Sequence, residues 1–255
     1  MAQPLAERLR PKTLDDYIGQ KHLVGQGAIL RKMIDAGRIS SFILWGPPGV
    51  GKTTLAQIIA NKLETPFYTL SAVTSGVKDV RDVIEKAKSN RFFSQAGPIL
   101  FIDEIHRFNK LQQDALLPYV ENGTVILIGA TTENPYFEVN KALISRSMVF
   151  RLNPLTTKDI FLVLKKSLTA ERGLANYNIK IEDSTLEKIA ETSNGDVRTA
   201  LNGLEVAVLT TQMDKDGYIT ITDEIAKECV QERKAIFDKN GDIHYCLLYT
   251  SPSPR

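Results

Sequence analysis

A glycine-rich octapeptide in the first half of the chain has the pattern of a phosphate-binding loop. The residues GPPGVGKT fit G-x-x-x-x-G-K-[ST] at every position, between an apolar run and a helical pattern. Glycines let backbone N–H groups converge on phosphate oxygens, and the following helix N-terminus adds partial positive charge. We expect a nucleoside triphosphate to be held by Gly46, Pro47, Pro48, Gly49, Val50, Gly51, Lys52, Thr53 and Thr54.

Two side chains of this loop have specific expected roles. Lys52 is expected to reach the β- and γ-phosphates, and the hydroxyl oxygen of Thr53 to bind Mg²⁺. The alternative is a glycine-rich turn that binds nothing. It is disfavoured because strand, loop and helix follow one another in the order that phosphate binding needs.

Adjacent carboxylates end another apolar run, in the sequence ILFIDE. Asp103 is placed to hold Mg²⁺ through water, and Glu104 to polarise an attacking water molecule. Both are expected at the carboxyl edge of a parallel sheet, where open α/β folds bind ligands. The second acid favours a hydrolase over a nucleotide kinase, which needs an acceptor pocket instead. A solvated acidic turn is the alternative.

Hydrolysis also needs a group that senses the γ-phosphate and one that neutralises developing charge. Thr132, at the tip of the run VILIGATT, is our candidate for the first role, with Thr131 as the alternative. Arg146, just before the run MVFRL, could reach a neighbouring subunit's nucleotide. A plain surface arginine is the alternative for Arg146, and Arg151 is a weaker candidate for the same role.

A second cation of interest is Arg198, in the sequence NGDVRTALNGLE. It falls in the first turn of an expected helix, where a positive charge opposes the helix dipole. A nucleotide phosphate in front of the helix would explain its position. An ion pair with Asp196 or Glu205 would explain it equally well.

The hydrophobic pattern predicts the elements that carry these residues. Short apolar runs alternate with helical patterns, which is typical of a parallel sheet covered on both faces. The expected strands are 42–45, 67–70, 99–103, 125–130 and 148–152, and helices alone are expected later, at 158–171, 184–193, 196–212 and 222–236. We therefore predict an α/β core at 1–152, followed by a small all-helical lid domain at 153–232.

The end of the chain differs in character from what precedes it. Residues 246–255, CLLYTSPSPR, resemble translated sequencing-adapter sequence appended to a truncated reading frame, and we favour this over a natural disordered tail. No function is assigned to them.

Composition indicates a soluble globular protein with no strong global field. Of the 255 residues, 43% are hydrophobic and 24% charged, and the net charge of +2 means that nucleic acid would be bound by local patches. No apolar run approaches the roughly 18 residues that span a bilayer, and no secretory signal is recognised. Two cysteines fit a reducing compartment. We expect a cytoplasmic, nucleoid-associated protein with no membrane partner.

The order of these features along the chain resembles that of an AAA+ ATPase. The features are the phosphate-binding loop, the acidic pair, the polar strand tip at Thr132, Arg146 and the helix that begins with GDVR. The resemblance implies a P-loop core with a five-stranded parallel sheet, followed by a helical lid. The resemblance implies ATP and Mg²⁺ as ligands. The N-terminal segment, PLAERLRPKTLDDYIGQKHLVG, is similar to one that wraps the adenine in clamp-loader subunits and branch-migration motors. That likeness assigns residues 1–25 to adenine wrapping and brings Arg8, Tyr17 and Ile18 near the base.

Within this group the run from FIDEIHRFNK to LISRS closely resembles the replication-associated recombination protein A family. The resemblance implies a tetrameric, DNA-dependent ATPase at stalled or gapped forks, acting on single-stranded, forked or end-containing DNA with single-strand-binding protein. Ser147 stands where many members carry cysteine. Residues 233–245 match only the start of the family's helical oligomerisation domain, so tetramerisation, and a role for Arg146 in a neighbouring site, are open for this chain.

Residue chemistry alone supports DNA binding weakly. The candidate contacts are Lys78, Arg81, Lys86, Lys88, Arg91, Arg107 and Lys110, but acidic residues alternate with several of them, and a solvated helix face is favoured for each singly. His106 is interpreted as a turn residue.

Other functions stay open. The alternatives are a clamp-loader or branch-migration subunit, an ATP-switched binding module with little turnover, and a protein unfoldase. The last is disfavoured because SAVTSGVKDVR has no aromatic residue for a threading loop.

Overall fold

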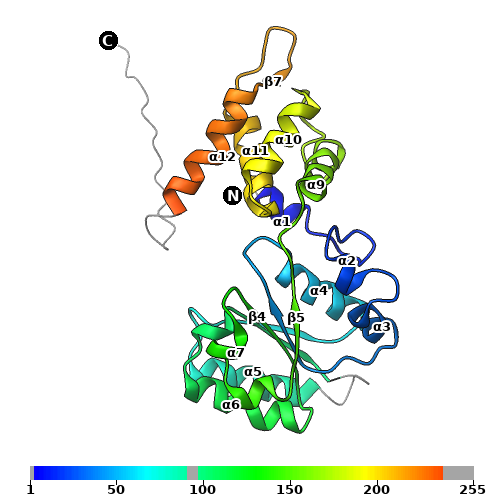
Figure 1. Ribbon diagram of the computed structural model, residues 1–255, viewed down its shortest axis with the longest axis vertical. Coiled ribbons are helices and arrows are strands. Elements are labelled where there is room, and N and C mark those ends of the chain that lie inside the picture. The colour runs from blue at the N-terminus through cyan, green and yellow to red at the C-terminus, as the bar shows by residue number, and fades with distance from the viewer. Residues whose placement is uncertain (1–2, 91–96, 238–255) are drawn as a thin grey trace.

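The chain forms an α/β domain and a mainly helical domain joined by a narrow waist (Figure 1). The computed structural model describes residues 3–90 and 97–237. Arg91, residues 238–245 and the expected tail at 246–255 therefore lie outside the described residues. Within the described ranges, no helix is both long enough and apolar enough to cross a bilayer.

A five-stranded parallel sheet forms the centre of the α/β domain. The strands are β1 (Phe42–Trp45), β2 (Phe67–Ser71), β3 (Ile99–Asp103), β4 (Ile126–Thr131) and β5 (Met148–Arg151), in the order β2-β3-β4-β1-β5. All four pairings are parallel, so the carboxyl ends of the strands meet at one edge. The five expected strands are confirmed to within a residue at each end.

Helices cover both faces because successive residues of the buried strands alternate between two hydrophobic clusters. Ile99 and Phe101 pack with α2 (Lys21–Val24), α3 (Ile29–Asp35) and α4 (Lys52–Lys62). Leu100 and Ile102 pack on the other side with α5 (Val77–Asn90), α6 (Lys110–Glu121) and α8 (Lys141–Ile144). A short 3-10 helix, η2 (Ile105–Arg107), follows β3, and α7 (Pro135–Glu138) follows β4.

Four helices build the lid: α9 (Thr157–Thr169), α10 (Asp183–Thr192), α11 (Val197–Thr210) and α12 (Asp223–Phe237). The expected helical lid is present, but it is not all-helical. β6 (Ile179–Ile181) and β7 (Ile219–Ile221) pair in parallel as a separate two-stranded sheet. Three-residue strands are too short to show a hydrophobic period, which is why the sequence pattern did not reveal them. α12 also continues past the expected lid boundary at 232.

The first helix, α1 (Leu5–Arg8), packs on the lid although it precedes the α/β domain in the chain (Figure 1). Leu5 is fully buried in the lid's hydrophobic cluster, together with Leu201 and Leu204 of α11. The division expected at 152/153 is therefore wrong for this segment. Residues after α1 run from the lid back to the sheet and bridge the two domains.

Candidate nucleotide-binding site

The phosphate-binding loop lies between β1 and the N-terminus of α4. Gly49 and Gly51 adopt left-handed backbone conformations (φ 68° and 94°), which residues with a Cβ rarely adopt. At Gly51 a second constraint applies, since a Cβ atom would lie 2.7 Å from the hydroxyl of Tyr17. That hydroxyl is directed at the carbonyls of Val50 (3.2 Å) and Gly51 (3.3 Å), and burial raises the pKa of Tyr17 above its ordinary value.

Lys52 is the first residue of α4 and the one Lys or Arg side chain that is buried among the described residues. Its Nζ donates to the carbonyls of Gly46 (2.6 Å) and Pro47 (2.8 Å). Desolvation lowers the pKa of Lys52, while the nearby carboxylates of Glu104 and Asp103 oppose this effect. The ammonium is thus held within the loop, on the side that faces the acidic pair.

The acidic pair stands at the carboxyl end of β3, as expected. Asp103 is the last residue of the strand, and Glu104 follows in a left-handed conformation (φ 52°) that is uncommon outside glycine. Thr132, just past β4, directs its hydroxyl at Glu104, with Oγ1 3.3 Å from Oε2. Thr131 is fully buried and points elsewhere.

Lys52, Asp103 and Glu104 line the smaller of two adjoining cavities, whereas Thr132 lines neither and contacts Glu104 from beside them. The smaller, of about 140 Å³, is polar and is lined by Ala6, Glu7, Arg10, Pro48, Gly49, Gly51, Lys52, Thr53, Thr54, Asp103, Glu104, Val197, Arg198 and Leu201. The larger, of about 670 Å³, shares Gly51 and Thr54 with it and is rich in apolar side chains from the N-terminal segment and the lid. Tyr17 and Ile18 line the larger cavity, so their expected proximity to a base is consistent with the geometry. A polar chamber beside an apolar one suits the two ends of a nucleotide.

The lid reaches this site through the N-terminus of α11. The carboxylate of Asp196 caps the helix, accepting from the backbone N–H groups of Arg198 (2.8 Å) and Thr199 (3.1 Å). The Arg198 side chain lines the polar cavity. The alternative pairing with Glu205 does not occur, because Glu205 binds Arg8 at 2.8 Å.

Arg8, which was expected near the base, does not line the larger cavity. Its guanidinium is used within the lid, donating to the carbonyls of Arg172 (3.0 Å) and Gly173 (2.9 Å) as well as to Glu205. Arg10, two residues later, lines both cavities instead. Arg8 and Arg10 could not be separated by sequence pattern, because only the lid contacts decide which one faces the nucleotide site.

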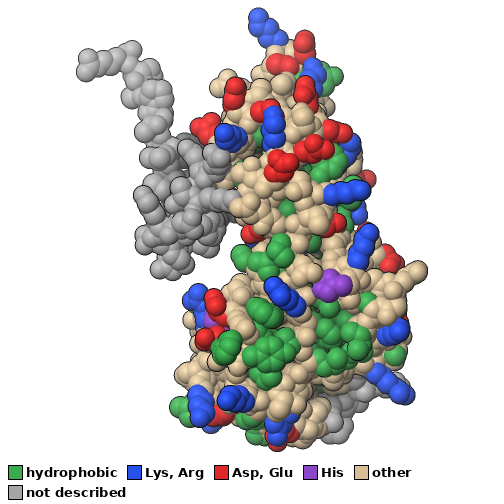
Figure 2. Space-filling view, in the orientation of Figure 1, with side chains coloured by type: hydrophobic (Ala, Val, Ile, Leu, Met, Phe, Trp, Pro, Cys, Tyr) green, Lys and Arg blue, Asp and Glu red, His purple; other side chains and the backbone are tan. Residues whose placement is uncertain are grey.

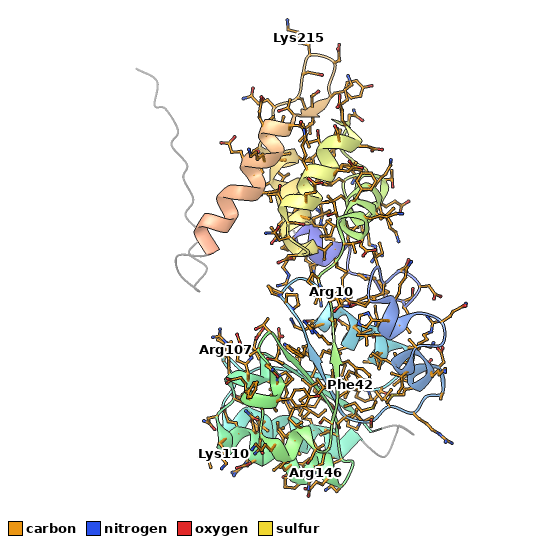
Figure 3. All side chains as sticks on the ribbon, viewed as in Figure 1. Arg10, Phe42, Arg107, Lys110, Arg146 and Lys215 are labelled. Carbon is orange, nitrogen blue, oxygen red and sulfur yellow. The ribbon has the colours of Figure 1, made fainter. Side chains whose placement is uncertain are left out.

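Arg146 lies at the end of the α/β domain away from the lid, whereas Arg10 lies at the waist (Figure 3). It is 2.6 Å from Glu121 and also donates to the carbonyl of Ala142 (3.0 Å), with its side chain 42% exposed. Arg146 therefore does not enter the cavities of its own chain. The weaker candidate, Arg151, stacks over the ring of Trp45, 5.1 Å from its centroid.

The donor set fits Mg²⁺. The Thr53 hydroxyl and the Asp103 carboxylate line the same polar cavity and are hard oxygen ligands, and Mg²⁺ usually takes one or two of these and keeps several waters. Among the described residues no cluster of three or more His, Cys, Asp or Glu side chains could hold another kind of metal ion.

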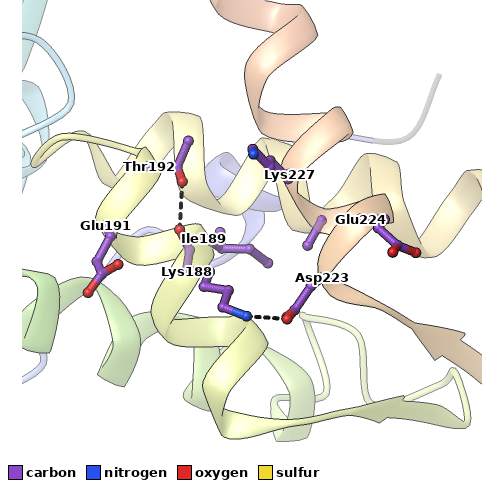
Figure 4. Close-up of a pocket in the computed structure, with 8 residues that line it drawn as sticks. Lys188, Ile189, Glu191, Thr192, Asp223, Glu224 and Lys227 are labelled. Atoms are coloured by element: carbon purple, nitrogen blue, oxygen red, sulfur yellow. Dashed lines mark hydrogen bonds and ion pairs between the residues drawn. The ribbon is translucent and has the colours of Figure 1, made fainter.

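A separate pocket of about 390 Å³ lies between α10 and α12 in the lid (Figure 4). Two of its charged residues, Lys188 and Asp223, form an ion pair across it. None of the residues singled out from the sequence lines it, so we assign it no role in nucleotide binding.

Comparison with known families agrees with this geometry. Residues 42–155 match the ATPase family associated with various cellular activities (AAA), and residues 175–248 match the AAA C-terminal domain family. Replication-associated recombination protein A of Haemophilus influenzae is 50% identical over 246 residues, and the Bacillus subtilis protein of that name is 47% identical over 247. The chain belongs to the replication-associated recombination protein A family of AAA+ ATPases. These alignments cover 96% of this chain but 55% and 58% of the relatives, so the chain spans little more than half their length.

Solved structures show the same architecture. A variant of Thermotoga maritima RuvB superposes with a TM-score of 0.70 and is 30% identical, over 88% of this chain and 73% of that one. The unsubstituted RuvB, described as a Holliday junction branch migration motor, gives a TM-score of 0.67 at 28% identity. The five-stranded core with its C-terminal helical region is therefore an AAA+ architecture.

Charged residues on the surface are mixed in sign. Figure 2 shows acidic and basic side chains interspersed over the lid, and hydrophobic side chains gathered over the α/β domain on this face. Of the candidate DNA contacts, Lys88 pairs with Glu85 (2.7 Å). Within the described chain, the following are exposed and form no ion pair: Lys78, Arg81, Lys86, Arg107 and Lys110 (the last two labelled in Figure 3).

Proposed function

We propose that the chain is the ATPase part of a DNA-dependent AAA+ enzyme that maintains replication forks during recombination and repair. One observation supports hydrolysis most strongly: Lys52, Glu104 and Arg198, from three separate segments, line one polar cavity. Family membership supports the link to DNA, since the relatives are named for replication-associated recombination.

Each residue has a defined role in the proposed reaction. Lys52 and the loop N–H groups bind the β- and γ-phosphates, and Thr53 and Asp103 hold Mg²⁺, which supplies charge neutralisation when bound. Glu104 accepts a proton from the attacking water as the new phosphorus–oxygen bond forms and the bond to the ADP oxygen breaks. Thr132 and Arg198 report occupancy of the γ-phosphate position.

The larger cavity is proposed to take the adenosine. Tyr17, Ile18 and Arg10 line it from the bridging segment, while Val197 and Leu201 line it from the lid. A nucleotide there would contact both domains at once. Loss of the γ-phosphate would therefore change the angle between core and lid and alter the grip on DNA.

The proposed partners follow from the family. DNA with single-stranded, forked or free ends, single-strand-binding protein and further copies of the chain are the expected ones, in the bacterial cytoplasm near the nucleoid. Arg146, which is exposed and outside its own site, is proposed to complete the site of a neighbouring copy.

Steady-state turnover with different effectors tests the DNA assignment. We expect forked or single-stranded DNA to raise the rate of ATP hydrolysis, and an unfolded protein to leave it unchanged. Duplex DNA without ends serves as the matched control. Stimulation by unfolded protein alone would favour an unfoldase, and turnover indifferent to every DNA, also with the relatives' C-terminal region fused on, would contradict the proposal.

A further inference from the structure

His106 lies within hydrogen-bonding reach of both the acidic pair and the tip of β4. It occupies η2, directly after Glu104 and Ile105, and its side chain is only 14% exposed. Nδ1 is 3.3 Å from Glu104 Oε2 and 2.9 Å from the hydroxyl oxygen of Thr131. The interpretation of His106 as a turn residue is therefore incomplete, because its ring joins two strands of the sheet.

The surroundings of Thr131 determine which ring nitrogen carries the proton. Thr131 is fully buried, its Oγ1 accepts from the backbone N–H of Glu133 (3.0 Å), and its hydroxyl can donate to the carbonyl of that residue (3.3 Å). When the hydroxyl donates there, its oxygen is left to accept from Nδ1–H of His106. The opposite tautomer would place a bare nitrogen lone pair against the Glu104 carboxylate, which is unfavourable.

Glu104 is the residue that needs such support. Its backbone is left-handed (φ 52°, ψ 48°), a conformation that a residue with a Cβ keeps only when its surroundings hold it there. Its Oε2 accepts from Thr132 and faces Nδ1 of His106. Thr132 reaches the carboxylate directly from the end of β4, and Thr131 reaches it through the histidine.

We propose that His106 is a positioning residue for Glu104: Nδ1–H, anchored on Thr131, fixes the orientation of the carboxylate toward attacking water. This inference rests on the proposed hydrolytic role of Glu104. His106 lines neither nucleotide cavity, so it acts on the reaction through Glu104 and leaves nucleotide binding alone.

Two amide substitutions distinguish a positioning donor from a merely structural ring. In His106→Asn the amide nitrogen takes the place of Nδ1, whereas in His106→Gln it takes the place of the other ring nitrogen. We expect H106N to keep kcat within about threefold of wild type, and H106Q to lower it by about ten- to 100-fold, with KM for ATP unchanged in both. Equal kcat for the two variants, or a loss expressed only in KM, would overturn the proposal.

Two further measurements distinguish failure of this inference from failure of the proposed function: turnover of the Glu104→Gln variant, and the ring nitrogen of His106 that carries the proton. If E104Q turns over like wild type, the hydrolytic role of Glu104 is wrong. If E104Q is inactive while H106Q is as fast as wild type, only the role of His106 is wrong. In ¹⁵N NMR spectra of the neutral imidazole, we expect His106 protonated at Nδ1, and more of the other tautomer in Thr131→Val. A wild-type ring protonated at Nε2 alone would overturn the proposal even without turnover.

Discussion

Asp196 of the lid is in direct contact with Gly49 of the phosphate-binding loop. A Cβ atom built on Gly49 would overlap the Asp196 carboxylate, and the neighbouring Val197 N–H is directed at the Gly49 carbonyl (3.4 Å). The residue that caps α11 thus also fixes the distance between lid and loop. This contact explains how a change in the loop can reach the lid without a mobile linker between them.

Gly49→Ala is predicted to separate the lid from the loop. The added methyl group would displace Asp196, which should weaken nucleotide binding about tenfold or more because Arg198 moves with it. Binding of a fluorescent ATP analogue measures the affinity for nucleotide, and urea denaturation measures the stability.

Gly37→Ala is the matched control. Gly37 has nearly the same backbone angle (φ 65° against 68°), but a Cβ there would meet nothing within 4 Å. Both variants should lose about 1 kcal/mol of stability from the left-handed conformation, and G49A alone should lose affinity. Equal nucleotide affinity in the two variants would show that the contact between Gly49 and Asp196 does not contribute to nucleotide binding.

Lys52→Met is predicted to raise stability while abolishing nucleotide binding. Burial lowers the pKa of Lys52 below its ordinary value of 10.5, so the folded protein binds its proton less tightly than the unfolded chain. Stability therefore rises with pH between the lowered pKa and 10.5, and below this window the full cost of the buried charge is present. Removing the charge should raise Tm at pH 7 by about 2–4 °C for each kcal/mol relieved.

The exposed Lys62 on the same helix, paired with Asp35, provides the comparison. Lys62→Met should leave Tm nearly unchanged, since surface pairs contribute about 0–1 kcal/mol. Thermal melts from pH 7 to 10.5 should show a steeper rise for wild type than for K52M. A lower Tm for K52M at pH 7 would mean that its bonds to the Gly46 and Pro47 carbonyls outweigh desolvation.

Arg8 and Arg10 are predicted to have different functions despite their proximity. Arg8→Ala removes hydrogen bonds to Glu205 and two lid carbonyls, and should cost about 2 kcal/mol of stability. Arg10→Ala, whose ion pair with Glu7 is on the surface, should leave stability within about 0.5 kcal/mol and lower ATP affinity. Denaturation of both variants measures stability, and nucleotide titration measures ATP affinity. A loss of affinity in R8A together with a loss of stability in R10A would contradict these two roles.

Arg146 is predicted to act on the site of a neighbouring copy. Arg146→Ala should leave ATP affinity and Tm unchanged, because its pair with Glu121 is half exposed, but should lower turnover of assembled protein by about 100-fold. Mixing R146A with Glu104→Gln subunits tests this directly, since some mixed interfaces would combine an intact Glu104 with an intact Arg146. Recovery of turnover on mixing is expected, and no recovery in confirmed mixed assemblies would contradict action between copies.

Sequence pattern predicted most of the α/β domain because its strands are long apolar runs between helices with a clear period. The sequence pattern did not predict β6 and β7, because a strand of three residues is too short to show a hydrophobic period. The packing of α1 on the lid was not predicted either. Leu5 is one apolar residue among several in its segment, and its partners lie about 200 positions later in the chain.

For the candidate site, residue spacing was sufficient to predict which side chains lie together where they come from one segment, as in the loop at Lys52 and the pair at Asp103. It was insufficient where the role depends on a second segment. The lid decides between Arg8 and Arg10, and the end of β4 gives His106 its contact with Thr131.

The proposed ATPase activity requires Glu104 to act as the general base in the polar cavity that it lines together with Lys52. Single-turnover hydrolysis of prebound ATP by wild type and Glu104→Gln, with affinity measured in parallel, tests it most directly. We predict equal ATP affinity and a hydrolysis rate at least about 100-fold lower in E104Q. Hydrolysis by E104Q within about twofold of the wild-type rate would contradict the role of Glu104 as general base.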